Sequence, residues 1–170
     1  MAKKNLTVGM VVLFFIVFSA CSKQKYNDES DFQIRIVENK EVTIIGYQGE
    51  NTAVKIPPKI KKLPVTIIGE SAFSKKYLTN VSIPNTVTHI KISAFRDNEL
   101  TSIVIPDSVT EIEQQVFDNN SLVSITIGAN VYLSIIDWAD RSFEYAYHEG
   151  GKIAGTYSRP DTRSRTWTKE

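Results

Sequence analysis

Apolar residues recur at a fixed interval of 22 residues through the middle of the chain. The recurring positions form three series, which are Phe73, Phe95 and Phe117, then Ile83, Ile105 and Ile127, then Val87, Val109 and Val131. An upstream segment, residues 53–77, follows the same pattern with five additional residues before Val65. Such a period is typical of a solenoid, in which each unit buries its apolar side chains against its neighbours. We therefore predict about four coils of roughly 22 residues over residues 53–136.

The unit at residues 100–121 indicates how one coil is built. Leu100, Ile103 and Ile105 nearly alternate and are mostly β-branched, which predicts a short strand. The strand should stop before Pro106, because proline cannot donate to a β-ladder. Stacking these strands predicts a mainly β repeat solenoid with a parallel sheet of short strands. Its expected core consists of Phe73, Phe95, Phe117, Ile83, Ile105, Val87 and Val109.

The segment before the repeats, residues 32–52, is expected to cap the solenoid. Phe32, Ile34 and Ile36 alternate with polar residues, and a second apolar run begins at Val42 after a polar turn. This pattern predicts a β-hairpin. A solenoid needs an atypical terminal unit to protect its open end.

The segment after the repeats, residues 137–170, is expected to be a C-terminal cap. Phe143 and Tyr147 are four residues apart before a pair of glycines, which favours a short helix with a glycine stop. Residues 154–157 and the region around Trp167 are then expected to pair as a hairpin.

The N-terminus has the features of a signal segment. Residues 1–20 combine two lysines with an apolar stretch from Leu6 to Ala20, which is too short to span a bilayer comfortably. The sequence Phe18-Ser19-Ala20-Cys21 resembles a bacterial lipobox, which implies cleavage before Cys21 and acylation of its thiol and amino group. Residues 21–31 are then expected to be a flexible, lipid-anchored tether. The alternative is an ordinary secreted protein with a spare cysteine.

The composition indicates a globular chain with few catalytic options. Of the 170 residues, 42% are hydrophobic and 23% charged, and after residue 20 there are 18 basic against 19 acidic side chains. This near-neutral balance lacks the excess of basic residues that is typical of nucleic-acid-binding proteins. The single cysteine excludes a disulfide framework and a cysteine-rich zinc site.

Candidate catalytic or metal-binding residues do not form a convincing set. His89 and His148 lack a third ligand nearby in sequence. Asp137 and Asp140 are better explained as part of an exposed turn than as a hydrolytic pair. Similar acidic and amide residues occupy 97–99 and 118–120, which are 21 positions apart, but turn residues explain them better than stacked calcium ligands. The sequence therefore predicts no enzyme, no metal and no cofactor.

Three phrases, LPVTIIGESAF, LTNVSIPNTVTHI and LTSIVIPDSVTEI, resemble the BspA-like, treponemal-type bacterial leucine-rich repeats. The tail FEYAYHEGGKIAGTY resembles a module that follows these repeats in treponemal members. One departure is that Gly69 of the first unit is replaced by Lys91 and Glu113 in the next two.

The resemblance implies a leucine-rich-repeat fold in a lipoprotein of the bacterial outer membrane or cell surface. It also implies binding to protein partners such as host matrix or other bacterial surface proteins, without catalysis or a cofactor. A periplasm-facing lipoprotein that scaffolds envelope components remains the alternative.

Two surfaces are candidates for binding. The first is the outward face of the predicted strands, which is small, hydroxylated and nearly uncharged, and it comprises Lys55, Asn80, Ser82, Ser102, Val104, Ser124 and Thr126. Leucine-rich repeats commonly bind through this side, although a solvated sheet face explains the same residues.

The second candidate surface is a basic patch in the tail. It comprises Arg159, Arg163, Arg165 and Lys169, with Tyr157 and Trp167 nearby. Arginines beside aromatic rings can bind sulfated glycans or an acidic protein surface. The alternative is a solvated hairpin whose apolar side covers the last coil.

Overall fold

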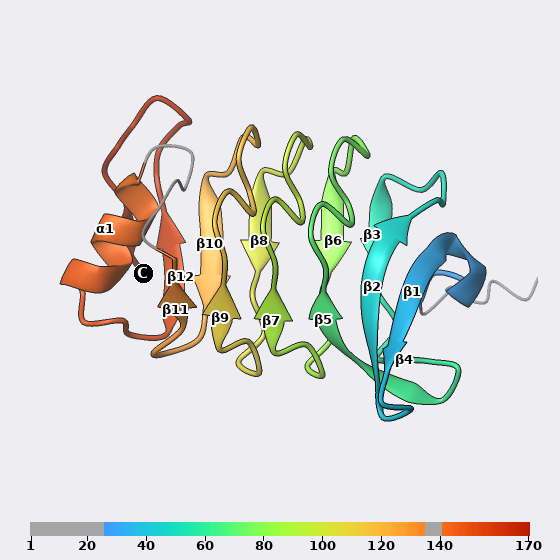
Figure 1. Cartoon of the computed structure of the whole chain (residues 1–170). Coiled ribbons are helices and arrows are strands. Elements are labelled where there is room, and N and C mark those ends of the chain that lie inside the picture. Colours follow the sequence, from blue (N-terminus) through green and yellow to red (C-terminus); the bar gives the residue numbers. More distant parts are fainter. Residues whose placement is uncertain (1–25, 135–140) are drawn as a thin grey trace, which may run out of the picture.

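The computed structural model describes residues 26–134 and 141–170. Figure 1 shows a solenoid of stacked coils with a β-hairpin at its N-terminal end and a helix with a second hairpin at the other. The solenoid makes about four turns, which confirms the predicted fold class. The predicted signal peptide at residues 1–20, Cys21 and the Asp137 and Asp140 pair lie outside the described residues.

Each coil contributes two short strands, which form two rows along the solenoid (Figure 1). The first row is the predicted one and contains β3 (Ala53–Lys55), β6 (Asn80–Ser82), β8 (Ser102–Val104) and β10 (Ser124–Ile127). The second row was not predicted and contains β5 (Leu63–Ile68), β7 (His89–Ile90), β9 (Glu111–Ile112) and β11 (Tyr132–Leu133). A strand of two residues is too short to show an alternating pattern in sequence.

The second row is continuous with the N-terminal hairpin. Strands β1 (Phe32–Val37) and β2 (Glu41–Tyr47) pair antiparallel, as predicted, and β2 then pairs parallel with β5. The sheet runs in the order β1-β2-β5-β7-β9-β11. The additional residues of the first coil form β4 (Lys59–Ile60), which folds back antiparallel onto β5.

The first row is interrupted in its middle, which corrects the expectation of one parallel sheet. Strands β3 and β6 form a two-stranded sheet, and β8 and β10 belong to a separate four-stranded sheet. Within residues 26–134, no backbone ladder joins β6 to the neighbouring β8. The two β-sheet fragments are held together by the second row, where β7 pairs with both β5 and β9.

Aromatic rings form a column through the core. Phe73 stacks on Phe95 with ring centroids 5.1 Å apart, and Phe95 stacks on Phe117 at 5.6 Å. Tyr47 of the N-terminal hairpin extends the column, 5.4 Å from Phe73. All seven residues predicted to form the core are buried, so the repeat register is confirmed.

The C-terminal cap has the predicted helix and hairpin. Helix α1 (Ser142–Glu149) buries Phe143 and Tyr147 against the last coil. The Tyr147 hydroxyl donates to the Gly128 carbonyl at 2.7 Å and accepts from the Val131 N–H at 3.0 Å. Strand β12 (Gly155–Ser158) pairs antiparallel with β10 on one side and with β13 (Thr168–Lys169) on the other.

The end of the predicted tether is folded, which corrects the expectation of flexibility over residues 27–31. Asn27 is buried, and η1 (Glu29–Asp31) forms a short 3-10 helix directly before β1. The Asn27 N–H donates to the Lys55 carbonyl at 2.9 Å, and the Asn27 side-chain oxygen accepts from the Lys55 N–H at 2.8 Å. These bonds attach the incoming chain to the edge of β3.

Candidate functional site

The predicted binding face lies along the first row of strands, as expected from the repeat. Five of its members are exposed, namely Lys55, Asn80, Ser82, Ser102 and Val104. Ser124 and Thr126 are only half-exposed, and the Thr126 hydroxyl is hydrogen-bonded to the Thr156 hydroxyl of β12 at 2.9 Å. The structure thus brings all seven residues onto one row, with the part nearest the C-terminal hairpin partly covered.

The interruption between β6 and β8 creates a groove in this face. The groove has a volume of about 260 Å³ and is lined by Asn80, Ser82, Ser102 and Val104 among others. Val104 is 62% exposed, which makes it the largest open apolar contact of the face. The groove can therefore offer hydroxyl and amide groups beside one apolar side chain to a partner.

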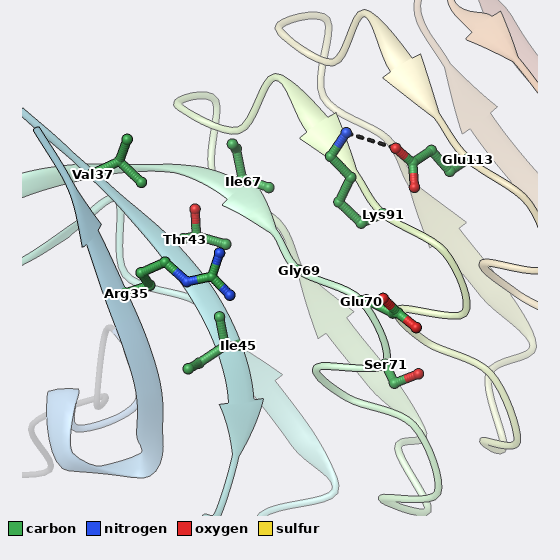
Figure 2. Close-up of a pocket in the computed structure, with 10 residues that line it drawn as sticks. All are labelled: Arg35, Val37, Thr43, Ile45, Ile67, Gly69, Glu70, Ser71, Lys91 and Glu113. Carbon is green, nitrogen blue, oxygen red and sulfur yellow. Dashed lines mark hydrogen bonds and ion pairs between the residues drawn. The ribbon is translucent and has the colours of Figure 1, made fainter.

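A larger groove lies on the outward side of the second row and was missed by sequence analysis. We call it the hairpin groove. It has a volume of about 660 Å³, and its lining includes Arg35, Ile45, Ile67, Glu70, Lys91 and Glu113. Figure 2 shows that these side chains come from the hairpin strands β1 and β2 and from the first three coils.

The hairpin groove combines an apolar floor with a charged border. Ile45 is 40% exposed and Ile67 is partly exposed, so apolar surface is open to a ligand. Figure 2 shows Arg35 on the β1 side and Glu70 across from it. The Lys91 ammonium and the Glu113 carboxylate pair at 2.6 Å along the same border. Charges of both signs around apolar surface are typical of a protein-binding site.

Gly69 explains why the hairpin can lie so close to the first coil. The Gly69 N–H donates to the Ile44 carbonyl at 2.7 Å. A Cβ atom at this position would lie 2.6 Å from the same oxygen. Lys91 and Glu113 occupy the equivalent position in the next coils, where each N–H donates to a carbonyl of the preceding coil, that of Ile68 or Ile90, at 2.9 Å. Gly69 keeps the glycine of the family pattern, whereas Lys91 and Glu113 depart from it, so no local sequence signal was specific to this groove.

A line of outward side chains runs along the second row of strands. Strand register aligns Ile67, His89, Glu111 and Tyr132 on successive strands. The His89 ring nitrogen Nε2 lies 3.5 Å from the Glu111 carboxylate. His89 therefore has a partner within the sheet, and among the residues that the structure describes no group of three potential metal ligands is found.

The structure divides the predicted basic tail patch. Arg159 is used internally, since its Nε donates to the Leu122 carbonyl at 2.8 Å and its guanidinium lies 4.7 Å from the centre of the Trp167 ring. Tyr157 and Trp167 are both buried. Arg163, Arg165 and Lys169 are exposed. Only Arg163, Arg165 and Lys169 of the predicted patch are therefore available to an anionic partner. The rings of Tyr157 and Trp167 are buried and cannot contribute to such a contact.

Comparisons with known proteins agree with this architecture. A family model described as the BspA type leucine-rich repeat region matches residues 52–146 in six copies, which is more than half of the chain. No curated protein matches the chain in sequence. Within the described residues, no helix is both long and apolar enough to cross a membrane.

Two crystal structures are similar to the chain. A leucine-rich-repeat protein from T. pallidum is 27% identical with a TM-score of 0.53, and the match covers 65% of this chain and 64% of that one. A leucine-rich-repeat protein from Bacteroides capillosus is 25% identical with a TM-score of 0.52, and the match covers 65% and 88% of the two chains. This chain thus spans less than two thirds of the T. pallidum protein.

Proposed function

Because this chain belongs to the BspA-type leucine-rich-repeat family, we propose that it is a lipid-anchored protein that binds other proteins at the bacterial cell surface and acts in adhesion. Leucine-rich-repeat domains generally mediate contacts between proteins and are typically scaffolds without catalytic activity. The function proposed here therefore requires no cofactor and no reaction.

The hairpin groove is the observation that carries this proposal. Its volume of about 660 Å³ leaves room for an anchoring side chain of a partner. Binding energy in protein interfaces is concentrated in a few anchoring side chains that enter such depressions. The floor at Ile45 and Ile67 can take an apolar anchor, and Arg35 and Glu70 can fix polar groups beside it. The groove between β6 and β8 supplies a smaller second contact.

Lipid attachment at Cys21 is the second part of the proposal. The small residues before Cys21 and the apolar stretch from Leu6 support it. More than one acyl chain gives stable attachment, because each buried CH₂ contributes about 0.8 kcal/mol. The domain begins at Asn27, six residues after Cys21, so the solenoid would be held near the lipid surface.

Site-specific photo-crosslinking on living cells tests which surface binds. A benzophenone amino acid is placed at Ile45 in the hairpin groove or at Val104 on the first row, and a matched control is placed at Ile153, which is 53% exposed on the C-terminal cap. We expect a discrete protein adduct from Ile45, a weaker one from Val104 and none from Ile153. Adducts of equal yield at all three positions, or at none, would contradict a binding function for these surfaces.

A further inference from the structure

The point where the chain enters the fold is fixed next to a group of exposed lysines. Asn27 is hydrogen-bonded through its N–H and its side-chain oxygen to Lys55 on β3. Two residues later, the Glu29 carboxylate accepts from the N–H of Lys61 at 3.0 Å. The entering chain therefore runs between β3 and the hairpin formed by β4 and β5.

Four lysines surround this entry point, and we call them the lysine surface. They are Lys55, Lys59, Lys61 and Lys62, and all four are exposed. Lys61 and Lys62 form the tip of the β4–β5 hairpin with φ angles of 51° and 68°. Among the described residues, none of these four ammonium groups forms an ion pair.

Three nearby carboxylates, those of Asp28, Glu29 and Asp31, form no ion pair with the lysine ammonium groups. Asp28 accepts from the N–H and hydroxyl of Ser30, and these hydrogen bonds lower its pKa. The Asp31 carboxylate accepts from the Asn27 side chain at 3.1 Å. These carboxylates are held by local hydrogen bonds and keep their negative charge, so they reduce the net positive charge at the entry point but leave the four ammonium groups unpaired.

The sequence shows that charge is distributed unevenly along the chain. Residues 21–31 and 55–62 together contain six lysines and three acidic residues, a net charge of +3. The rest of the chain after residue 20 contains 12 basic and 16 acidic residues, a net charge of −4. An anionic surface would therefore attract this end of the solenoid and repel the remainder.

We propose that the lysine surface docks onto the anionic headgroups of the membrane that carries the lipid anchor. This inference rests on the proposed lipid attachment at Cys21. Six Cα–Cα steps from Cys21 to Asn27 reach at most about 20 Å, at roughly 3.3–3.6 Å per residue. Clustered lysines next to a membrane attachment bind anionic lipids, and the attraction falls off within about one Debye length. The first coil would then lie on the membrane, with the later coils projecting away from it.

Vesicle binding without the anchor tests this proposal independently of lipidation. The chain from residue 21 with Cys21→Ser retains every described element, and its co-sedimentation is measured with vesicles of phosphatidylcholine alone or with 30% phosphatidylglycerol. We expect binding only to the anionic vesicles, and at least tenfold weaker binding at 0.5 M salt. The K59Q/K61Q/K62Q variant should bind at least tenfold more weakly than the parent at low salt.

A matched variant separates position from net charge. K75Q/K76Q/K152Q removes the same number of charges. Lys75 and Lys76 lie in the turn that follows β5, and Lys152 lies in the C-terminal cap. This variant should bind like the parent. Equal losses in the two variants, or no preference for anionic vesicles, would overturn the proposal. Thermal unfolding of each variant verifies that the fold is intact.

The single cysteine allows a second measurement of orientation. Coupling Cys21 to a maleimide lipid holds the chain on vesicles of either composition, and amine acetylation then reports the accessibility of each lysine. On anionic vesicles, Lys59, Lys61 and Lys62 should be protected while Lys75 and Lys76 react freely. Identical labelling on both vesicle types would reject the docking. Failure of native Cys21 to be acylated in cells would instead reject the anchor, so the two failures are distinguishable.

Discussion

Asn98 and Asn120 stand 22 residues apart and make equivalent hydrogen bonds in successive coils. The Asn98 amide donates to the carbonyls of Phe73 and Phe95, each at 2.8 Å, and its oxygen accepts from the Leu78 N–H at 2.9 Å. One side chain thus joins its own coil to the preceding one. The repeated asparagine therefore provides a polar contact between successive coils, in addition to the apolar core.

We predict that Asn98→Ala destabilises the protein by about 2–3 kcal/mol, because buried backbone groups would lose their partners. Asn98 is only 7% exposed, whereas Asn120 is partly exposed to water. Asn120→Ala should therefore have the smaller effect. Urea unfolding of both variants measures the difference, and a larger loss from Asn120→Ala would contradict this account.

The second prediction concerns the contribution of the aromatic column to stability. Phe95 is fully buried between Phe73 and Phe117, so Phe95→Ala removes contacts to both neighbouring coils. We expect a loss of about 3–5 kcal/mol in the free energy of unfolding. Tyr77→Ala is the control, because Tyr77 is 69% exposed on a turn. A thermal midpoint left unchanged by Phe95→Ala would be incompatible with the stacked register.

The third prediction concerns the close approach of the N-terminal hairpin to Gly69. Gly69→Ala places a methyl group against the Ile44 carbonyl and should destabilise the protein by about 1–3 kcal/mol, as for other overpacked sites. Lys91→Ala at the equivalent position loses only a partly exposed ion pair, worth about 0.2–1 kcal/mol. Chemical unfolding compares the two. A Gly69→Ala protein as stable as the parent would show that the hairpin can shift without cost.

The fourth prediction concerns how the stability of the protein depends on pH through the buried Tyr147. Burial raises the pKa of Tyr147 above its ordinary value of 10.0, so the unfolded chain loses this proton first as the pH increases. The stability that depends on protonated Tyr147 is therefore complete below pH 10 and declines as the pH rises above it.

Tyr147→Phe tests this dependence. The variant should be less stable at pH 8, since the hydrogen bond to Gly128 is lost, but its stability should fall less steeply between pH 9 and 11. Tyr145→Phe provides the control, because Tyr145 lies on the same helix and is 68% exposed. Parallel pH profiles for Tyr147→Phe and the parent would contradict the assigned role of burial.

The sequence was most informative where the repeat itself carries the structure. The period of 22 places Phe73, Phe95 and Phe117 in one buried column, and the first row of strands follows from the alternating run before each proline. The helix was also predictable, because Phe143 and Tyr147 lie on one face of it before two glycines. These features depend on local spacing alone.

Features that depend on contacts between distant segments could not be predicted. Strand β9 has only two residues, Glu111 and Ile112, and it exists because its neighbours β7 and β11 offer ladder partners. The hairpin groove requires β1 and β2 to lie beside three coils, and Gly69 alone did not indicate this contact. Docking of Asn27 on β3 joins residues 28 positions apart. No local pattern encodes that contact.

The proposed surface function requires the domain to face outward from the cell, and protease accessibility on intact cells reports this orientation. A protease is added to living cells, and a periplasmic protein is followed in parallel as the control for envelope integrity. We predict that the domain is digested while the control survives. Protection of the domain until the envelope is permeabilised would contradict a surface function and would favour a scaffold of envelope components.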